Sequence, residues 1–269
     1  MTTLIIAAHG SRHDTSVNDH VRNLARSLRN SGRFDDVVAT FHQGEPSFDE
    51  VLGQVSSTGV IVVPLMTSDG YYSDVVLPRE LRRHPRFATL DVHITTPIGT
   101  HPMILDMVAD RVAMLANGHL LPLAETVIGV VGHGTTRHEQ SRRSTEELGR
   151  KIERLGIAAK TFTAFLDEEP SVQSLRARTG NRHLIVIPFL ISDGYHVRHD
   201  IPERLGFSGA AAKPSSVDGA QVPIERGGRW TIVDRPVGTD RRIGDVVMAL
   251  ATETVSCRMP QHAVAVGSA

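Results

Sequence analysis

The stretch LIVIPFLISDGYHVRHDIP, residues 184–202, occurs a second time in altered form as VIVVPLMTSDGYYSDVVLP, residues 60–78. Each copy begins with a run of apolar, β-forming residues and continues into a polar segment that contains Asp-Gly. A short apolar run bounded by turn residues is typical of a strand with both faces covered, as in a parallel sheet. The two stretches therefore predict two related α/β units, in each of which a buried strand leads into a loop.

The similarity between the two units extends on both sides of this stretch. The shift that aligns His9 with His133 also aligns Pro46 with Pro170. The alignment is interrupted in the second copy by an inserted segment that is rich in Gly, Ala and Ser. A regular internal repeat of this kind indicates a tandem duplication. The predicted units are residues 1–122 and residues 123–257, with a surface loop or flap inserted at 207–229 and a tail at 258–269.

Each unit is expected to contain its elements in the order strand, helix, strand, helix, strand, loop, strand, helix. This alternation predicts a parallel sheet flanked by helices. The expected strands are residues 4–8, 37–41, 60–65 and 91–95 in the first unit and 127–131, 158–165, 184–191 and 230–233 in the second. The expected closing helices are residues 102–117 and about 240–254. The predicted fold class is α/β, with two small parallel sheets that face one another across a cleft.

The helix after the first strand of each unit is expected to bury a stripe of apolar residues that recur at helical spacing. The expected stripes are Val21, Leu24, Ala25 and Leu28 in the first unit and Leu148, Ile152 and Leu155 in the second. Gly156 follows the second stripe and is expected to end that helix in a left-handed conformation.

The composition argues against several classes of function. The formal net charge of the 269 residues is −1 and only 4% of them are aromatic, which disfavours a nucleic-acid partner. The single cysteine, Cys257, excludes an internal disulfide and a cysteine-based metal site within one chain. The first residues lack the pattern of a signal peptide, and no apolar run approaches the roughly 20 residues that span a bilayer. We therefore expect a cytoplasmic protein with no membrane partner, as a monomer or a homodimer.

A histidine follows the first strand of each unit. His9 opens the segment His-Gly-Ser-Arg, and His133 opens His-Gly-Thr-Thr-Arg. A strand that leads through His-Gly into a helix is suited to bind a small anion or a metal, because glycine frees the backbone and the next N–H groups face the strand end. A histidine here can instead hydrogen-bond a neighbouring loop, but its presence in both units favours binding. A histidine-type phosphatase is disfavoured because Ala8 and Gly132 stand where it needs arginine.

Two further groups follow strands of the second unit. Asp167 comes just after the apolar strand that ends at Phe165, and His196 lies beyond the next strand. Because the carboxyl ends of parallel strands lie at one edge of a sheet, we expect both side chains to approach His133. Two imidazoles and a carboxylate make a site for a borderline divalent cation. Helix-end, capping or surface roles are expected for Glu45, Glu168, Glu169, His199 and Asp200.

These motifs resemble the sirohydrochlorin chelatases of the CbiX/SirB type, which are class II tetrapyrrole chelatases, in their two-copy long form. The resemblance covers residues 4 to about 250 and rests on four motifs in order: His-Gly-Ser-Arg at 9–12, Phe-x-Asp with Pro-Ser at 165–171, apolar-Pro-Phe-Leu at 187–190 and Gly-x-His-x-x-x-Asp-Ile-Pro at 194–202. It implies two α/β halves across a cleft. It also implies ATP-independent insertion of Co²⁺, which we favour, or of Fe²⁺ or Ni²⁺ into a sirohydrochlorin-type tetrapyrrole, as in cobalamin or siroheme biosynthesis. The metal would be a substrate, with no permanently bound cofactor.

The resemblance also implies roles for individual residues. His133 and His196 would bind the metal and accept the pyrrole protons, with Asp167 as a ligand or proton relay. The residues expected to contact the macrocycle are His9, Ser11, Arg12, Tyr72, Thr135 and Arg137. Tyr72 stands at the position of His196, and Gln43 at that of Asp167, so the second half is expected to be the active one. Many two-half members keep the full set in the first copy instead.

Two alternatives belong to other classes of protein. The altered first copy also fits a binding protein that holds a metal or a tetrapyrrole and delivers it without turnover. Such a protein would bind its ligand stoichiometrically and would not accelerate metal insertion. A nucleotide-binding α/β protein is disfavoured because the chain contains neither GxGxxG nor GxxxxGK(S/T).

Overall fold

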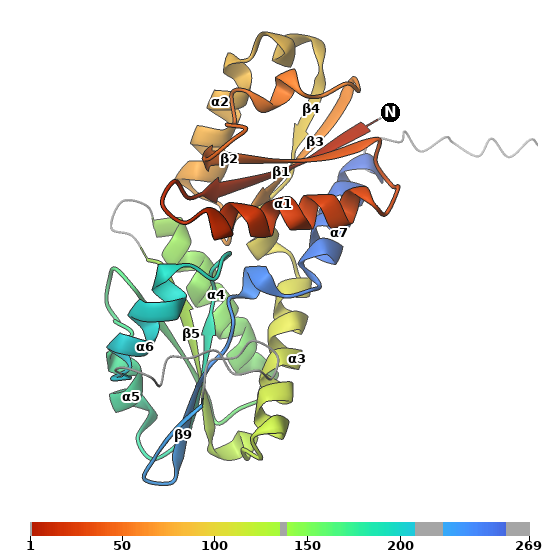
Figure 1. Cartoon of the computed structure of the whole chain (residues 1–269). Helices are drawn as coiled ribbons and strands as arrows, with labels where there is room; N and C mark the ends of the chain where they lie inside the picture. Colours follow the sequence, from red (N-terminus) through yellow and green to blue (C-terminus); the bar gives the residue numbers. More distant parts are fainter. Residues whose placement is uncertain (1, 135–138, 208–222, 257–269) are drawn as a thin grey trace, which may run out of the picture.

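The structure, a computed structural model, describes residues 2–134, 139–207 and 223–256. Its strands form two sheets (Figure 1). The first has the strand order β2-β1-β3-β4, and the second has the order β6-β5-β7-β9-β8. The strands are β1 (Thr2–Gly10), β2 (Asp36–Gln43), β3 (Gly59–Leu65), β4 (Asp91–Ile94), β5 (Thr126–Gly132), β6 (Lys160–Phe165), β7 (His183–Pro188), β8 (Ile224–Arg226) and β9 (Arg229–Val233). The two predicted sheets are confirmed.

Neighbouring strands of both sheets run parallel, except that β8 and β9 are antiparallel. The helices are α1 (Thr15–Arg29), α2 (Leu77–Arg83), α3 (Met103–Gly118), α4 (Glu139–Leu155), α5 (Ser174–Thr179), α6 (Ile201–Arg204) and α7 (Ile243–Ser256). In the central strand β1, Ala8 lies opposite Phe41 of β2 and Leu65 of β3. The strands around β1 therefore end at nearly the same level, and the segments that follow them share one edge of the sheet.

The continuous apolar runs are explained by burial on both sheet faces. Leu4, Ile5 and Ile6 of β1 are all completely buried, although successive side chains of a strand point to opposite faces. Each buried side chain of this size contributes about 1.5–3 kcal/mol relative to an exposed one. The apolar runs therefore stabilise the central strands, which in turn position the polar segments after them.

The segment after the third strand of each half is helical, not the expected loop. In the first half a π-helix spans Tyr71–Val76 and continues into α2. In the second half a π-helix spans His196–Asp200 and continues into α6, and β7 ends at Pro188 rather than at residue 191. Pro78 and Pro202 are the second residues of α2 and α6, at the point where each π-helix changes to an α-helix. Proline lacks the N–H that a regular helical turn uses, so it stands where the hydrogen-bond pattern changes. His196 therefore stands on a helical turn.

The inserted segment is only partly a loop. Ile224–Arg226 forms β8, which pairs with β9, and Phe207 is buried in the core of the second half. The expectation of a surface loop over 207–229 is wrong for these residues, because β8 covers the edge that β9 would otherwise expose. Residues 208–222 and the expected tail at 258–269 lie outside the described residues.

The stripe on α4 is shorter than expected. Leu148 and Ile152 are buried, whereas Leu155, the last residue of the helix, is 47% exposed. Its inclusion in the stripe is therefore wrong, since the helical repeat carries the last turn away from the core. Gly156 has φ +63°, which confirms the left-handed end predicted for this helix.

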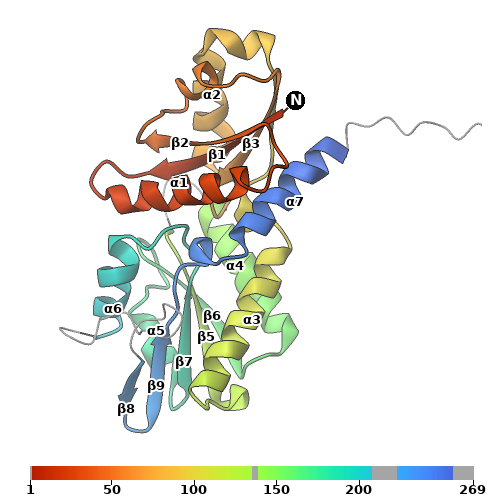
Figure 2. The ribbon, with the colours of Figure 1, turned by 45° about the vertical axis from the view of Figure 1, so that its right-hand side comes forward.

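The closing helices cross between the halves. α3 packs against β7 and α4 of the second half, whereas α7 packs against β3 of the first half (Figure 2). One hydrophobic core therefore contains residues of both halves, including Ile6, Ile104, Ile128 and Val247. A division at residue 122 keeps each sheet intact but separates it from the helix that covers it.

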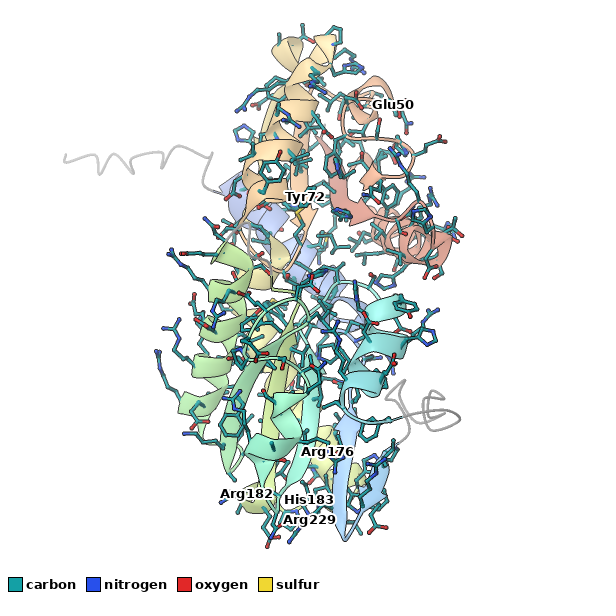
Figure 3. The ribbon with its side chains drawn as sticks, turned by 90° about the vertical axis from the view of Figure 1, so that its left-hand side faces the viewer. Glu50, Tyr72, Arg176, Arg182, His183 and Arg229 are labelled. Carbon is teal, nitrogen blue, oxygen red and sulfur yellow. The ribbon has the colours of Figure 1, made fainter. Side chains whose placement is uncertain are left out.

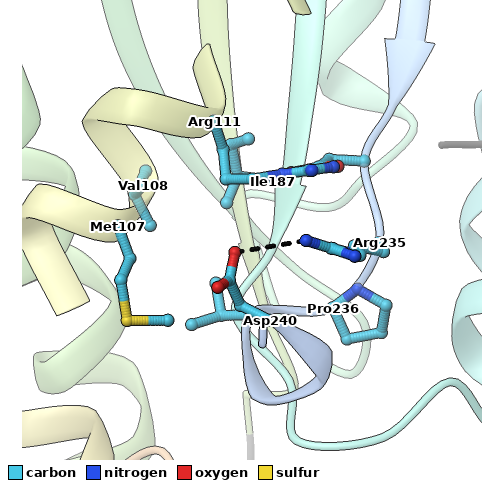
Figure 4. Close-up of a pocket in the computed structure, with 9 residues that line it drawn as sticks. Met107, Val108, Arg111, Ile187, Arg235, Pro236 and Asp240 are labelled. Atoms are coloured by element: carbon cyan, nitrogen blue, oxygen red, sulfur yellow. Dashed lines mark hydrogen bonds and ion pairs between the residues drawn. The ribbon is translucent and has the colours of Figure 1, made fainter. Parts of the chain in front are cut away.

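A buried ion pair adds a polar link to this exchange. Arg111 of α3 donates two hydrogen bonds to the carboxylate of Asp234, which follows β9, and the Nε to Oδ2 distance is 3.0 Å. The two side chains are only 9% and 3% exposed. Figure 4 shows Arg111 beside Arg235 and Asp240, which lie 3.4 Å apart. The cavity that these residues line has a volume of about 10 Å³, close to that of one water molecule, and is too small for a substrate.

Candidate functional site

The carboxyl ends of both sheets lie where the two halves meet. A Cβ atom on Gly70, beyond β3, would lie 3.9 Å from the Cβ of Gln140 in α4. In the same way, a Cβ atom on Gly194, beyond β7, would lie 3.7 Å from Cγ2 of Val17 in α1. Figure 3 shows the opposite end of the second sheet, where His183 lies at the amino end of β7, far from Tyr72. The segments after the strands of each half therefore approach the other half.

A glycine in left-handed conformation follows each first-strand histidine. Gly10 has φ +71° and Gly134 has φ +70°, a region that residues with a side chain rarely adopt. A Cβ atom on Gly134 would also lie 2.8 Å from Cγ of Glu168. Both constraints account for the His-Gly pair in both copies. They leave His9 and His133 at the ends of the central strands.

The second half brings its three predicted catalytic side chains together. Nδ1 of His133 lies 3.1 Å from Oδ2 of Asp167, and the ring centroids of His133 and His196 are 5.1 Å apart. The rings are nearly perpendicular, at 75°. All three side chains are about half exposed, so a ligand can reach them.

The hydrogen-bond partners of these histidines determine which ring nitrogen is free. Nδ1 of His133 faces two acceptors, the carboxylate of Asp167 and the carbonyl of Gly134 at 3.0 Å. Nδ1 of His196 lies 2.5 Å from Oδ2 of Asp200. A nitrogen that faces acceptors carries the proton, so each neutral ring has a lone pair on Nε2. The second half thus offers two Nε2 atoms for a cation.

Asp200 orients His196 and is more than the capping residue expected from the sequence. A carboxylate behind a ligating histidine fixes its tautomer and raises its basicity. We expect Asp200→Asn to weaken Co²⁺ binding by the second half about 10- to 100-fold, because an amide cannot supply the same charge. Calorimetric titration of the chain with Co²⁺ measures this loss.

Asp193→Asn is the matched control for Asp200→Asn. Asp193 lies in the same segment but pairs with the exposed Arg198, at 3.1 Å, rather than with a histidine. This variant should keep the parental affinity for Co²⁺. Equal affinities of the Asp200 and Asp193 variants would contradict the role of Asp200.

The first half contains a different group of rings. Tyr72, at the position of His196, lies edge-on to His9 with the ring centroids 4.6 Å apart. His42 lies near both, at 5.5 Å from His9 and 5.1 Å from Tyr72. Nδ1 of His42 is 3.5 Å from Oε2 of Glu80 in α2. His42 and Glu80 were not among the predicted site residues, although a histidine at a strand end where the other copy has the buried Leu166 is a usable signal.

His9 is neutral near pH 7. Burial lowers the pKa of His9 below its usual value, the hydrogen bond with the Gly10 carbonyl opposes this shift, and the charges of His42 and His133 add to it. The effect of His133 on the pKa of His9 is the smallest of these and acts between the two halves. The predicted position of His9 opposite the second-half site is consistent with this.

The residues predicted to bind substrate carboxylates are placed unevenly. The hydroxyl of Ser11 accepts hydrogen bonds from the backbone N–H groups of His13 and Asp14, which order the turn before α1. Arg12 is exposed, and its side chain has no hydrogen bond or ion pair with another described residue. Thr135 and Arg137 lie outside the described residues. Arg12 is therefore the predicted cation that the structure leaves available to an anionic substrate.

The metal-binding groups form pairs rather than complete cages. Within residues 2–134, 139–207 and 223–256, no three His, Cys, Asp or Glu side chains are already grouped so that they could hold one ion. A pair of imidazoles leaves coordination positions open, which suits an ion that must be passed on. No helix in the same described ranges is long and apolar enough to cross a membrane.

Comparison with known sequences identifies similar proteins over nearly the whole chain. The CbiX family model matches residues 3–115 and again residues 127–254. The probable sirohydrochlorin cobaltochelatase of Halobacterium salinarum is 30% identical over 277 aligned positions, which cover 94% of this chain and 91% of the relative. The sirohydrochlorin cobaltochelatase of Methanopyrus kandleri is 32% identical over 131 positions, which cover 44% of this chain and 90% of that relative. The second relative thus corresponds to about one copy of the repeat.

Solved structures share the fold. The CbiX described as the terminal enzyme for biosynthesis of siroheme in denitrifying bacteria superposes with a TM-score of 0.71 at 20% identity, covering 96% of this chain and 100% of that one. SirB from Bacillus subtilis, solved with Fe³⁺, gives a TM-score of 0.72 at 14% identity, covering 94% and 95%. These matches confirm the predicted two-half architecture.

Proposed function

Because the chain belongs to the CbiX family, we propose that this metal chelatase inserts a divalent ion, preferably Co²⁺, into a sirohydrochlorin-type tetrapyrrole. The observation that carries the proposal is the His133–His196 pair, in which both Nδ1 atoms face acceptors, neither Nε2 atom has a hydrogen bond to a described residue, and the ring centroids are 5.1 Å apart. The preference for Co²⁺ is supported by the names of the two relatives, both called cobaltochelatases. Imidazole nitrogen is also a suitable ligand for Fe²⁺ and Ni²⁺.

In the proposed reaction, the ion enters the macrocycle as two pyrrole N–H protons leave. His133 and His196 hold the ion before transfer and can accept these protons afterwards, since neutral imidazole performs both tasks near pH 7. Asp167, 3.1 Å from Nδ1 of His133, stabilises the imidazolium that results or relays its proton to solvent. Arg12 and Ser11 are proposed to hold carboxylates of the macrocycle, with Arg137 and Thr135 as their partners in the second half.

The first half is proposed to contact the opposite face of the macrocycle through His9 and Tyr72. Tyr72 is 38% exposed and edge-on to His9, so its ring is accessible. Aromatic side chains offer large, rigid surfaces for contact with planar ligands. A location in the cytoplasm and a monomeric or homodimeric state remain predictions.

Anaerobic mixing of sirohydrochlorin and Co²⁺ with the chain tests the proposed activity. The absorption spectrum of the macrocycle should change many times faster than in the uncatalysed control, with no need for ATP, and one chain should convert many macrocycles. Stoichiometric binding without acceleration would instead identify the delivery protein that the altered first copy also fits. The same assay with Fe²⁺ and Ni²⁺ determines the preferred ion.

A further inference from the structure

His42 supplies the first half with a second imidazole from an unexpected strand. In the second half the second imidazole is His196, on the π-helix after β7, and the residue that corresponds to His42 is the buried Leu166. In the first half the position of His196 is taken by Tyr72, and the imidazole comes from the end of β2 instead. The second copy fills the position of His42 with the apolar Leu166, so packing alone does not require a histidine there.

The two histidine pairs have similar geometry. The ring centroids are 5.5 Å apart for His9 and His42 and 5.1 Å apart for His133 and His196, with interplanar angles of 60° and 75°. Two imidazoles that bind one tetrahedral ion through nitrogen at about 2.0–2.1 Å have centroids roughly 5 Å apart. Both pairs therefore match the separation that a shared cation requires.

Each pair also has a carboxylate behind one of its rings. Oε2 of Glu80 lies 3.5 Å from Nδ1 of His42, as Oδ2 of Asp200 lies 2.5 Å from Nδ1 of His196. The Glu80 side chain is 15% exposed, and its other oxygen lies 3.6 Å from Arg79. Nδ1 of His42 is buried and has no hydrogen-bond partner among the described residues. The Glu80 carboxylate is thus a charged neighbour of this nitrogen without a hydrogen bond to it, and its negative charge favours the tautomer with the proton on Nδ1 and the lone pair on Nε2.

We propose that His9 and His42 form a second divalent-cation site, in the first half, with Glu80 as the carboxylate that positions His42. His9 has the same tautomer as His133. Its Nδ1 lies 3.1 Å from the Gly10 carbonyl and carries the proton, so the lone pair is on Nε2. The site suits a borderline ion such as Co²⁺, Ni²⁺ or Zn²⁺, for which imidazole is a common ligand. The duplicated fold thus keeps a two-imidazole site in each half. The inference goes beyond metal insertion, since it concerns binding of the ion alone.

Titration of the full chain with Co²⁺ alone, without tetrapyrrole, tests this second site. The bound metal is counted by equilibrium dialysis and followed by the visible absorption of the ion. The parent should bind one ion per histidine pair, two in all. His42→Leu introduces the residue of the second copy and should remove one ion, and His196→Tyr introduces the residue of the first copy and should remove the other. The double variant should bind neither.

Two further variants serve as controls. His93→Ala removes a partly exposed histidine that pairs with Asp91, and it should keep both ions. Glu80→Gln should weaken the first-half site about tenfold or more without changing the other. A parent that binds one ion, or a folded His42→Leu variant that still binds two, would overturn the proposal. The two proposals can fail separately. If the parent inserts no metal but His42→Leu still binds one ion fewer than the parent, the first-half site is supported and the proposed activity is refuted.

Discussion

His196→Ala is expected to lower kcat/KM for Co²⁺ insertion by about 10²–10⁴-fold, the range typical for loss of a positioned acid–base group. The variant removes one imidazole of the pair formed with His133, so the ion loses a ligand and the pyrrole protons lose an acceptor. His196 is 45% exposed and its partner Asp200 lies on the same helical turn, so its removal should disturb the fold little. Initial rates from the absorption of the macrocycle, at varied Co²⁺, measure the loss.

His199→Ala is the matched control for His196→Ala. His199 lies on the same π-helix, is exposed, and stacks against Tyr195 with the ring centroids 4.9 Å apart. His199 does not pair with His133. The rate of Co²⁺ insertion by His199→Ala should therefore stay within about twofold of the parental rate, as for other exposed positions. A His196→Ala variant that inserts Co²⁺ at the parental rate would refute the assignment of the active half.

Asp234→Ala is expected to lower the free energy of unfolding by about 3–5 kcal/mol, because it removes the carboxylate that accepts two hydrogen bonds from the buried guanidinium of Arg111. Arg111 comes from the first copy of the repeat and Asp234 from the second. The pair therefore contributes to the packing of α3 on the second sheet. Urea denaturation followed by circular dichroism measures the change.

An exposed ion pair beside this one provides the control. Asp110, the neighbour of Arg111 on α3, lies 2.6 Å from Arg242 but is 69% exposed. Asp110→Ala should cost less than about 1 kcal/mol, as is usual for surface pairs. The double replacement Arg111→Met with Asp234→Leu should recover much of the loss, since it removes both charges of the buried pair. Similar costs for Asp234→Ala and Asp110→Ala would show that the buried pair has no special importance.

The sequence was sufficient to predict the repeat, eight of the nine described strands and the histidines at the strand ends. Residues 60–65 and 184–188 form strands as expected, because an apolar run between turn residues is a local signal. The segments after them were expected to be loops because Asp-Gly indicates a turn, although Pro78 and Pro202, the second residues of α2 and α6, are compatible with the start of a helix. Leu155 was misassigned because periodicity does not reveal where the core ends.

The family and the architecture were also predicted correctly from the four motifs, since each motif combines a strand end with a polar side chain of defined type. The roles of His133, His196 and Asp167 remain predictions that the geometry supports. Comparison of the two copies isolated His196. It also aligned His42 with the buried Leu166, but it did not show that His42 takes the place of His196 in the first half. An alignment compares residues at equivalent positions of the two copies. His42 and His196, which have similar places in the two histidine pairs, stand at positions that are not equivalent.

The sequence by itself determined that the chain consists of two related α/β units with a histidine at the end of each central strand. Burial pattern and turn chemistry are local properties, so they can be followed along the chain. Only the tertiary structure decided that α3 and α7 exchange sheets, and that Glu80 of α2 meets His42 of β2. Both closing helices present apolar faces, and nothing local distinguishes one sheet from the other. Which sheet each helix covers depends on how the whole core packs. The same packing decides which side chains face each histidine.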